Sequence, residues 1–356
     1  MNIPELHLPT TDPDFIKDPY PILKEFREKT PIFWDEINSL LFITRYKDVR
    51  KIQSSKVFGT TFNHIEGFED SPDNSTKPLT YVGYKRADKY ATYDNFWKSE
   101  EFSLLNLEGE LHGELRGLVA KAFLPRSVQK LVPFMEKKSS DLFSKTGDKP
   151  FDLLKEYAQP YSISVIGELL GVPEEDHNLF LDWSHRIVKM YDFEVSKEDA
   201  ESAEDAARDF YDYSLDLLNE RRSNPKDDMI TRLSQVSENN VYLTDQQIIC
   251  TMILLLNAGH EATVNTLGNG LRALVSNNID FDEIKNKNIP TKDVVEELIR
   301  WDSPLQFFLR YVLEDAEIGE YNIPKKSKVA ILLGSANHDG EQFEKPTEIN
   351  FQRENL

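Results

Sequence analysis

The stretch that decides this chain's fold is Ala258-Gly259-His260-Glu261-Ala262-Thr263, in the middle of its longest helical pattern. The pattern begins at Thr244, with Gln247 three residues later as a capping box requires, and continues to about Ser276. At 1.5 Å per residue, such a helix spans about 45–50 Å. It is apolar on nearly every side, so other elements must cover it. The small pair Ala258-Gly259 predicts a notch in this helix, with the Glu261 carboxylate beside it.

Composition and charge limit the classes of protein that this chain can belong to. Its 356 residues suffice for one large domain or two ordinary ones, and 39% of them are hydrophobic. The formal net charge of −20 argues against nucleic-acid binding and against docking on anionic lipid. The longest apolar run, 248–256, is too short to span a bilayer, so we expect no membrane segment. One cysteine, Cys250, and no secretion signal favour a reducing, cytoplasmic location.

Helical patterns dominate after residue 108. Besides the long helix, we expect helices at about 109–123, 127–144, 152–170, 175–190, 199–222 and 291–302. Strand-like runs form a predicted hairpin within 32–44, and a second strand region covers 316–333. The sequence therefore predicts a mainly α fold, a single domain over 1–356 with one long central helix and a small β region built from 32–44 and 316–333.

The segment 59–107 is predicted to be irregular and is rich in aromatic side chains. A loop of this length inside a compact domain is usually functional or disordered. Its aromatic residues favour order, and they suggest a lid over an apolar pocket. Tyr93 and Phe96 from this loop, with Leu255 from the long helix, are our candidates for lining a substrate pocket.

Three cationic side chains could bind an anionic group. His112 and Arg116 are four residues apart on a predicted helix and share one face, which suits a carboxylate or phosphate. Alternatively, His112 is a capping histidine and Arg116 an ordinary surface residue. Arg310 lies in a largely apolar segment where a charge needs a partner, so it is a possible third donor.

Two further motifs are weak when taken alone. Glu297 and Arg300 are three residues apart on a helix and can pair, although most such pairs are exposed, and Glu296 competes for the same arginine. His260-Glu261 matches the first two residues of the His-Glu-x-x-His motif of zinc proteases, but Val264 occupies the position of the second histidine. A zinc-protease site is therefore not predicted.

Taken in order, these fragments resemble the cytochrome P-450 haem-thiolate monooxygenases in their soluble bacterial form. The resemblance rests on His112 to Arg116, the stretch 258–263, Glu297 to Arg300, and the run from Arg310 to Asp339. It covers nearly the whole chain, and it accounts for the long helix with its small residues.

The resemblance implies a role for each of these residues. His112, Arg116 and Arg310 would hold the haem propionates, and Ala258 and Gly259 would lie over the iron. Glu297 and Arg300 would form a buried structural pair. The basic stretch from Arg116 to Lys130 would help to dock an acidic electron-transfer protein.

This sequence departs from the family pattern at two points. The family acid is usually followed by threonine, and this pair relays protons to dioxygen; here Glu261 is followed by Ala262, and Thr263 lies about 100° further round the helix. We expect Glu261 to act with ordered water or a substrate hydroxyl. The family's proximal cysteine lies in a glycine-rich loop that the resemblance places beyond Leu356, so we expect the C-terminal part to be missing. Cys250 is not expected to replace that ligand, and no metal ligand is predicted within the chain.

The leading hypothesis is a haem-dependent monooxygenase. It would insert one oxygen atom from dioxygen into a small lipophilic substrate, with electrons from a ferredoxin-type donor, and we expect a monomer. A peroxide-using relative is a variant of this hypothesis. The alternative is a haem-less, inactive scaffold that binds an apolar ligand.

Overall fold

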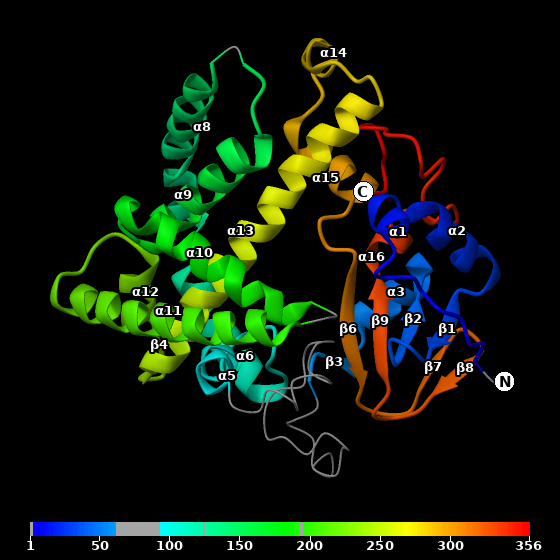
Figure 1. Cartoon of the computed structure of the whole chain (residues 1–356). Helices are drawn as coiled ribbons and strands as arrows, with labels where there is room; N and C mark the ends of the chain where they lie inside the picture. Colours follow the sequence, from blue (N-terminus) through cyan, green and yellow to red (C-terminus); the bar gives the residue numbers. More distant parts are fainter. Residues whose placement is uncertain (1–2, 62–92, 124, 148, 193–194) are drawn as a thin grey trace. The chain divides into compact units, whose positions relative to one another are not determined.

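The computed structural model describes residues 3–61, 93–123, 125–147, 149–192 and 195–356 (Figure 1). The chain divides into two compact units. The first unit holds the described residues of 1–68 and 265–356, and the second those of 69–264. Much of the aromatic loop, 62–92, lies outside the described residues. The expectation of a single domain over 1–356 stays a prediction.

The first unit is built on a mixed sheet. Its strands run in the order β1-β2-β9-β6-β3, with β2 and β9 parallel and the other neighbours antiparallel. The strands of this unit are β1 (Ile32–Asp35), β2 (Leu40–Ile43), β3 (Phe58–Gly59), β6 (Phe307–Val312), β7 (Ala316–Ile318), β8 (Tyr321–Ile323) and β9 (Lys328–Leu332). The predicted hairpin within 32–44 is confirmed as β1 and β2, and the region 316–333 is confirmed as β7, β8 and β9. Strand β6 is not among the predicted elements.

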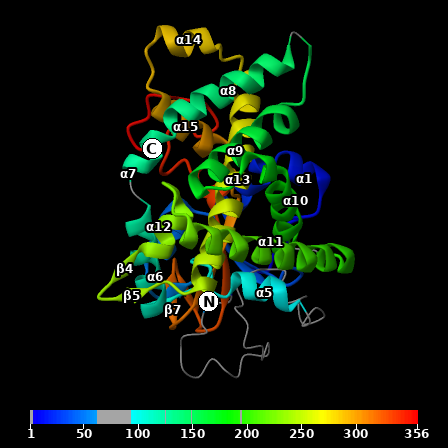
Figure 2. The ribbon, with the colours of Figure 1, turned by 90° about the vertical axis from the view of Figure 1, so that its left-hand side faces the viewer.

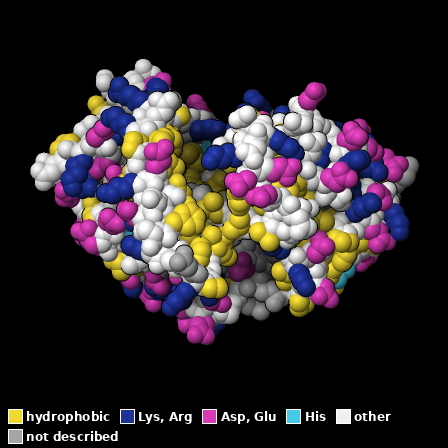
Figure 3. All heavy atoms as spheres, turned by 90° about the horizontal axis from the view of Figure 1, so that it is seen from above, with side chains coloured by type: hydrophobic (Ala, Val, Ile, Leu, Met, Phe, Trp, Pro, Cys, Tyr) yellow, Lys and Arg dark blue, Asp and Glu magenta, His cyan; other side chains and the backbone are white. Residues whose placement is uncertain are grey.

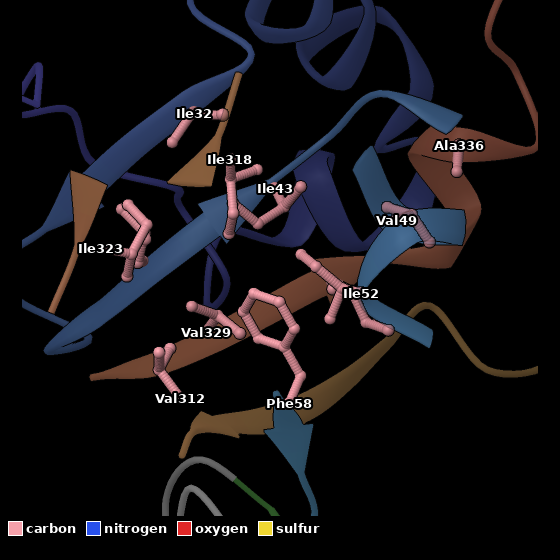
Figure 4. Packing of buried hydrophobic residues seen from close by; sticks show 12 residues of the cluster. Ile32, Ile43, Val49, Ile52, Phe58, Val312, Ile318, Ile323, Val329 and Ala336 are labelled. Carbon is pink, nitrogen blue, oxygen red and sulfur yellow. The ribbon is translucent and has the colours of Figure 1, made fainter. Parts of the chain in front are cut away.

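The first unit also contains helices. They are α1 (Pro13–Lys17), α2 (Tyr20–Lys29), α3 (Tyr46–Ser54), α14 (Phe281–Asn286), α15 (Thr291–Trp301) and α16 (Leu333–Ala336). Of these, α3 and α16 contact the sheet. Figure 4 shows the apolar core between the sheet and α3, where Ile52 and Phe58 meet Ile43 and Val329. All four positions of β2 are buried, as expected for a strand that pairs on both edges inside a sheet.

The second unit is almost entirely helical. Its helices are α5 (Asp94–Glu100), α6 (Gly109–Ala122), α7 (Pro125–Lys130), α8 (Val132–Thr146), α9 (Gln159–Leu170), α10 (His177–Val188), α11 (Lys197–Ser223) and α12 (Met229–Gln235). Shorter pieces are a π-helical turn (Leu154–Ala158), two 3₁₀ turns (Glu174–Asp176 and Lys189–Tyr191) and the strand pair β4 (Ser237–Glu238) and β5 (Val241–Tyr242). The mainly α fold is confirmed, although α5 lies in a segment predicted to be irregular.

Helix α11 shows why these helices form and pack. It begins after Ser196, whose hydroxyl accepts the backbone N–H of Asp199 at 3.0 Å, as an N-cap does. Its buried residues recur at helical spacing, from Ala200 and Ala203 to Phe210. This apolar face packs on α10, and the two helices lie side by side in Figures 1 and 2. Across the contact, Trp183 of α10 stacks on Phe210, and Phe180 meets the same ring edge-on.

Helix α13 (Asp245–Ser276) is the predicted long helix, and it is continuous. The capping box is confirmed: the Thr244 N–H donates to the Gln247 side chain at 2.9 Å, and the Gln247 N–H to the Thr244 hydroxyl at 3.2 Å. By length and composition α13 could cross a membrane, but 56% of its most apolar 18-residue stretch is buried inside the protein. That burial is typical of the core helix of a globular protein.

Candidate active site

The residues of 258–263 lie on different sides of α13, and each side has different neighbours. Gly259 faces α9: a Cβ atom added here would lie 3.0 Å from Ile166 Cδ1. Ser162 of α9 donates its hydroxyl to the Gly259 and His260 carbonyls at 3.3 and 3.2 Å. Gly259 therefore permits the close approach of α9, and the space beside it is filled by Ile166.

A different side of α13 carries the accessible small residues. Ala258 is exposed, and Leu255 and Ala262 are half-buried. These positions are three and four residues apart, so they share one face of the helix. The hydroxyl of Thr263 donates to the Gly259 carbonyl at 2.8 Å, one turn back along α13. The result is an apolar, accessible face formed by Leu255, Ala258 and Ala262.

Glu261 lies beside two histidines. Its Oε1 is 3.5 Å from His185 Nε2 on α10 and 4.0 Å from His260 Nε2. Burial raises the pKa of Glu261, with the His185 charge opposing that rise. Burial lowers the pKa of His260 to about 4, so His260 is neutral near pH 7. The carboxyl group is therefore held where it can take up a proton more readily than an exposed glutamate.

His112 and Arg116 lie one turn apart on α6. His112 is half-buried and Arg116 is exposed. Among the described residues, neither side chain has a hydrogen bond or an ion pair. A Cβ atom added at Gly113 or Gly117 would meet no described residue within 4 Å, so the described part of the protein leaves the helix surface around the two cations open. This face can accept an anionic group without displacing existing partners.

Arg310 belongs to the first unit, on strand β6. Its Nη1 donates to the Leu309 carbonyl at 2.7 Å, and its guanidinium lies 5.5 Å from the Phe308 ring centroid. Its register partner on β9 is Val329. The side chain is half-buried among apolar neighbours, which is the environment that the sequence indicated.

Glu297 and Arg300 of α15 form a buried pair. Arg300 donates through Nε and Nη2 to the two Glu297 oxygens at 2.7 and 2.8 Å. Arg353 adds a second guanidinium, at 3.0 Å from Glu297 Oε1. Burial alone would raise the pKa of Glu297, but these hydrogen bonds and the Asn350 N–H together hold it below its ordinary value. The competitor, Glu296, is half-buried and pairs with Lys292 instead, at 3.6 Å.

The candidate pocket residues from the aromatic segment are buried. Phe96 of α5 packs edge-on against Trp97, with ring centroids 5.0 Å apart, and lies 6.2 Å from the Tyr191 ring. Tyr93 directly precedes α5 and is 6% exposed. The assignment of Tyr93, Phe96 and Leu255 to a substrate pocket stays a prediction.

A separate cleft of about 950 Å³ lies in the first unit. It is lined by charged residues of both signs and by Tyr20, Trp301 and His338. The Tyr20 ring stacks on His338 at 4.1 Å, and its hydroxyl donates to Asp302 at 2.7 Å. None of the site residues predicted from the sequence lines this cleft.

Similarity to known proteins decides the family. A family model described as Cytochrome P450 matches residues 277–353. Cytochrome P450 107B1 of Saccharopolyspora erythraea is 31% identical over 318 residues, which cover 88% of this chain and 72% of that protein. This chain belongs to the cytochrome P450 family. The family resemblance drawn from the sequence is therefore confirmed.

Other cytochromes P450 match over most of the chain. The polyketide biosynthesis cytochrome P450 PksS of Bacillus subtilis is 29% identical over 349 residues, covering 96% of this chain and 80% of that protein. The crystal structure of P450BioI in complex with an acyl carrier protein ligated to hexadec-9Z-enoic acid superposes with a TM-score of 0.84 at 26% identity. It covers 96% of this chain and 83% of that one. This cytochrome P450 is thus an oxidoreductase, a haem-dependent monooxygenase that takes small-molecule substrates and electrons from a redox partner.

The chain's own residues fit a haem group. Its propionates need cationic donors, and the open α6 face offers His112 and Arg116 without existing partners among the described residues. A flat macrocycle needs an apolar surface free of long side chains, and Ala258 with Ala262 provides one on α13. Cys250 does not suit thiolate ligation: it is fully buried, its Sγ lies 3.4 Å from the Lys98 carbonyl, and burial raises its pKa to about 12.

Two residues of interest do not follow from the sequence. His185 has no local signal, because its neighbour Glu261 comes from a helix far along the chain. Arg353 lies in a C-terminal segment whose sequence assigns no role to its charge. Both act through contacts between distant segments, which periodicity does not reveal.

Proposed function

We propose that this cytochrome P450 inserts one oxygen atom from dioxygen into a small lipophilic substrate, as a cytoplasmic monomer. The observation that carries the proposal is the apolar face of Leu255, Ala258 and Ala262 next to a carboxyl group with a raised pKa. An apolar substrate gains about 25 cal/mol for each Å² of apolar surface buried on such a face. Two relatives support the substrate class, since their names link them to polyketide biosynthesis and to a fatty acyl chain.

His112, Arg116 and Arg310 are proposed to bind the two haem propionates. Charge-assisted hydrogen bonds from such donors are about twice as strong as neutral ones, and they orient the bound group. When bound, haem supplies the iron centre at which dioxygen is activated. Glu297 and Arg300 are proposed to hold α15 and the C-terminal segment in place, because Arg300 also donates to the Asn337 and Pro346 carbonyls at 2.8 Å.

Glu261 is proposed to deliver protons in place of the usual acid–alcohol pair. Ala262 has no hydroxyl, and the Thr263 hydroxyl is already bonded to the Gly259 carbonyl. Glu261 is half-buried, with its carboxyl group 3.5 Å from His185, so it can exchange protons with solvent while facing the interior. An ordered water or a substrate hydroxyl would carry the proton onward.

A ferredoxin-type protein is proposed as the electron donor. The basic stretch from Arg116 to Lys130 supports a docking role only in part, because Lys121 pairs with Glu238 at 2.9 Å and Lys130 with Asp227 at 2.6 Å. Both pairs are exposed and so contribute little stability, which allows them to rearrange when a partner binds. Acidic and basic side chains are interspersed over the face in Figure 3.

The test combines haem binding with isotope incorporation. The full-length gene product is loaded with haem, supplied with a ferredoxin and its reductase, and offered fatty acids and macrolide-like polyketides under ¹⁸O₂. We expect one ¹⁸O atom in each molecule of product. Glu261→Gln should lower turnover by about 100-fold, the usual contribution of a positioned acid, whereas Asp182→Asn on the exposed side of α10 should not. Haem binding without ¹⁸O incorporation from any substrate would contradict the proposal.

Arg116→Gln tests the propionate assignment separately. We expect faster loss of haem to an acceptor apoprotein, because one charged donor is removed. The exposed Arg126 serves as the matched control, since Arg126→Gln should leave the rate of haem loss unchanged. Equal rates in the two variants would overturn the assignment of Arg116.

A further inference from the structure

Three side chains with metal-binding atoms converge on one point of the second unit. His185 comes from α10, and His260 and Glu261 are consecutive residues of α13. One ligand atom of each lies within 4.8 Å of the other two. Glu261 Oε1 is 3.5 Å from His185 Nε2 and 4.0 Å from His260 Nε2. Two helices that are separate in sequence therefore supply two imidazoles and a carboxylate to the same place.

The buried histidine of this cluster lacks hydrogen-bond partners. The His260 side chain is 0% exposed, and neither ring nitrogen has a partner among the described residues. The Ser162 hydroxyl, which is near, bonds to the His260 backbone carbonyl and not to the ring. Leaving a buried polar group unpaired is unfavourable. A metal ion on Nε2 would supply a partner for one of the two nitrogens.

We propose that His185, His260 and Glu261 bind a divalent transition-metal ion of the Zn²⁺ type. Imidazole nitrogen and carboxylate oxygen are the ligands that such ions prefer. With metal–ligand bonds of about 2.0–2.2 Å, tetrahedral ligands lie about 3.3 Å apart. The separations of 3.5 and 4.0 Å from Glu261 therefore need to shorten by less than 1 Å, and the two imidazole nitrogens, which lie within 4.8 Å of each other, by about 1.5 Å at most. Changes of this size are within the reach of side-chain rotation. Water would fill the fourth position.

The surroundings allow an ion to enter and to be retained. The His185 and Glu261 side chains are 40% and 32% exposed, so the site has a path to solvent. The nearest cation in the sequence, Arg186, does not compete for Glu261, because it donates to Asp182 and Ser202. This arrangement differs from a zinc-protease helix: Val264 replaces the second helical histidine, and α10 supplies His185 instead.

Zinc titration of the full chain tests the site directly. The chain is dialysed against a chelator, and Zn²⁺ binding is measured by calorimetry. We expect one Zn²⁺ ion per chain, and zinc X-ray absorption should show two imidazole nitrogens. His185→Gln should weaken binding at least 10-fold, and Glu261→Gln should act similarly. His185 is half-exposed, so its variant should fold even where a variant of the buried His260 does not.

The controls separate a built site from surface binding. His7→Gln removes an exposed histidine of the first unit, and Asp182→Asn removes an exposed carboxylate of α10; both should bind Zn²⁺ as the unaltered chain does. The proposal is overturned if the unaltered chain binds no Zn²⁺, or if His185→Gln binds it with unchanged affinity and coordination.

A metal ion here would also occupy the proposed proton-delivery carboxyl group, a consequence that rests on the proposed function. Zn²⁺ should then lower the ratio of product to dioxygen consumed in the unaltered chain, and His185→Gln should resist this effect. The binding measurement needs no turnover. Failure of monooxygenase activity therefore leaves the zinc result interpretable, and failure of zinc binding leaves the activity test intact.

Discussion

The Arg300 guanidinium donates two parallel N–H···O hydrogen bonds to the Glu297 carboxylate, and both side chains are almost fully buried. Arg353 reaches the same carboxylate from the C-terminal segment, and the Asn350 N–H adds a further donor at 2.8 Å. One carboxylate therefore ties α15 to residues some fifty positions further along. Removing one partner of a buried ion pair leaves the other charge unpaired, which is far more destabilising than losing a surface pair.

Glu297→Gln should destabilise the protein by about 3–5 kcal/mol, because two guanidinium groups lose their counter-charge. Chemical denaturation measures the loss. Glu296→Gln is the matched control on the same helix: its pair with Lys292 is exposed, so the change should stay within about 1 kcal/mol. Similar losses in the two variants would contradict the structural role of Glu297.

Gly259→Ala should lower stability by about 1–3 kcal/mol, because the new Cβ would press on Ile166. Gly117→Ala is the matched glycine on α6, where a Cβ meets nothing within 4 Å. That change should stabilise by about 0.5–1 kcal/mol through helix propensity. Thermal unfolding measures both. A Gly259→Ala, Ile166→Ala double variant should recover part of the loss if the contact with Ile166 is responsible.

Because of His338, the free energy of unfolding should decrease as the pH is lowered. Burial lowers the pKa of its imidazole to about 4, although its hydrogen bond with the Trp301 carbonyl at 2.8 Å acts in the opposite direction. The unfolded chain binds the proton first, near pH 6.5, so stability is full above that pH and declines down to about pH 4. The contribution is about 3 kcal/mol. In His338→Gln, unfolding measured between pH 7 and 4 should lose this slope.

Ala262→Thr should raise the ratio of product to dioxygen consumed, because it restores an alcohol beside Glu261. Thr263→Ala is the control: its hydroxyl is bonded to the Gly259 carbonyl and points elsewhere, so its loss should change that ratio little. Oxygen uptake measured together with the amount of product gives this ratio for each variant. If the ratio of product to dioxygen consumed is unchanged in Ala262→Thr, the proposal that Glu261 delivers protons without a neighbouring hydroxyl loses its support.

Cys250 should resist alkylation in the folded protein. Its side chain is fully buried, and burial raises its pKa to about 12, so almost no thiolate forms at pH 8. Iodoacetamide followed by mass spectrometry should label Cys250 only after denaturation. Labelling of the native chain at the rate of a free thiol would show that this part of α13 opens readily.

The sequence predicts the elements that local chemistry specifies. The capping box at Thr244 locates the start of α13, and the apolar periodicity of 199–222 locates α11 to within two residues. Helix α5 escapes prediction for a physical reason: the backbone N–H groups of Asn95 and Phe96 are capped by the Glu204 carboxylate of α11, at 3.0 and 2.9 Å. A cap supplied from a distant helix leaves no local pattern.

The site is predicted unevenly for the same reason. Pairs within one helix, such as Glu297 with Arg300, follow from spacing alone. The partners that distinguish this chain come from elsewhere: His185 beside Glu261, Ile166 against Gly259, and Arg353 on Glu297. Sequence spacing places the residues on helices, but only the packing between helices shows which of them meet.

The parallel pairing of β2 with β9 also constrains how the protein is made. Leu41 pairs with Val329 and Ile43 with Ile331, so two neighbouring strands leave the ribosome almost a whole chain length apart. The hairpin of β1 and β2 can form at once, but the edge of β2 that pairs with β9 must wait, apolar and without its partner, while the helical unit is made. Newly made β1 and β2 are thus the segment for which chaperone protection matters most during synthesis.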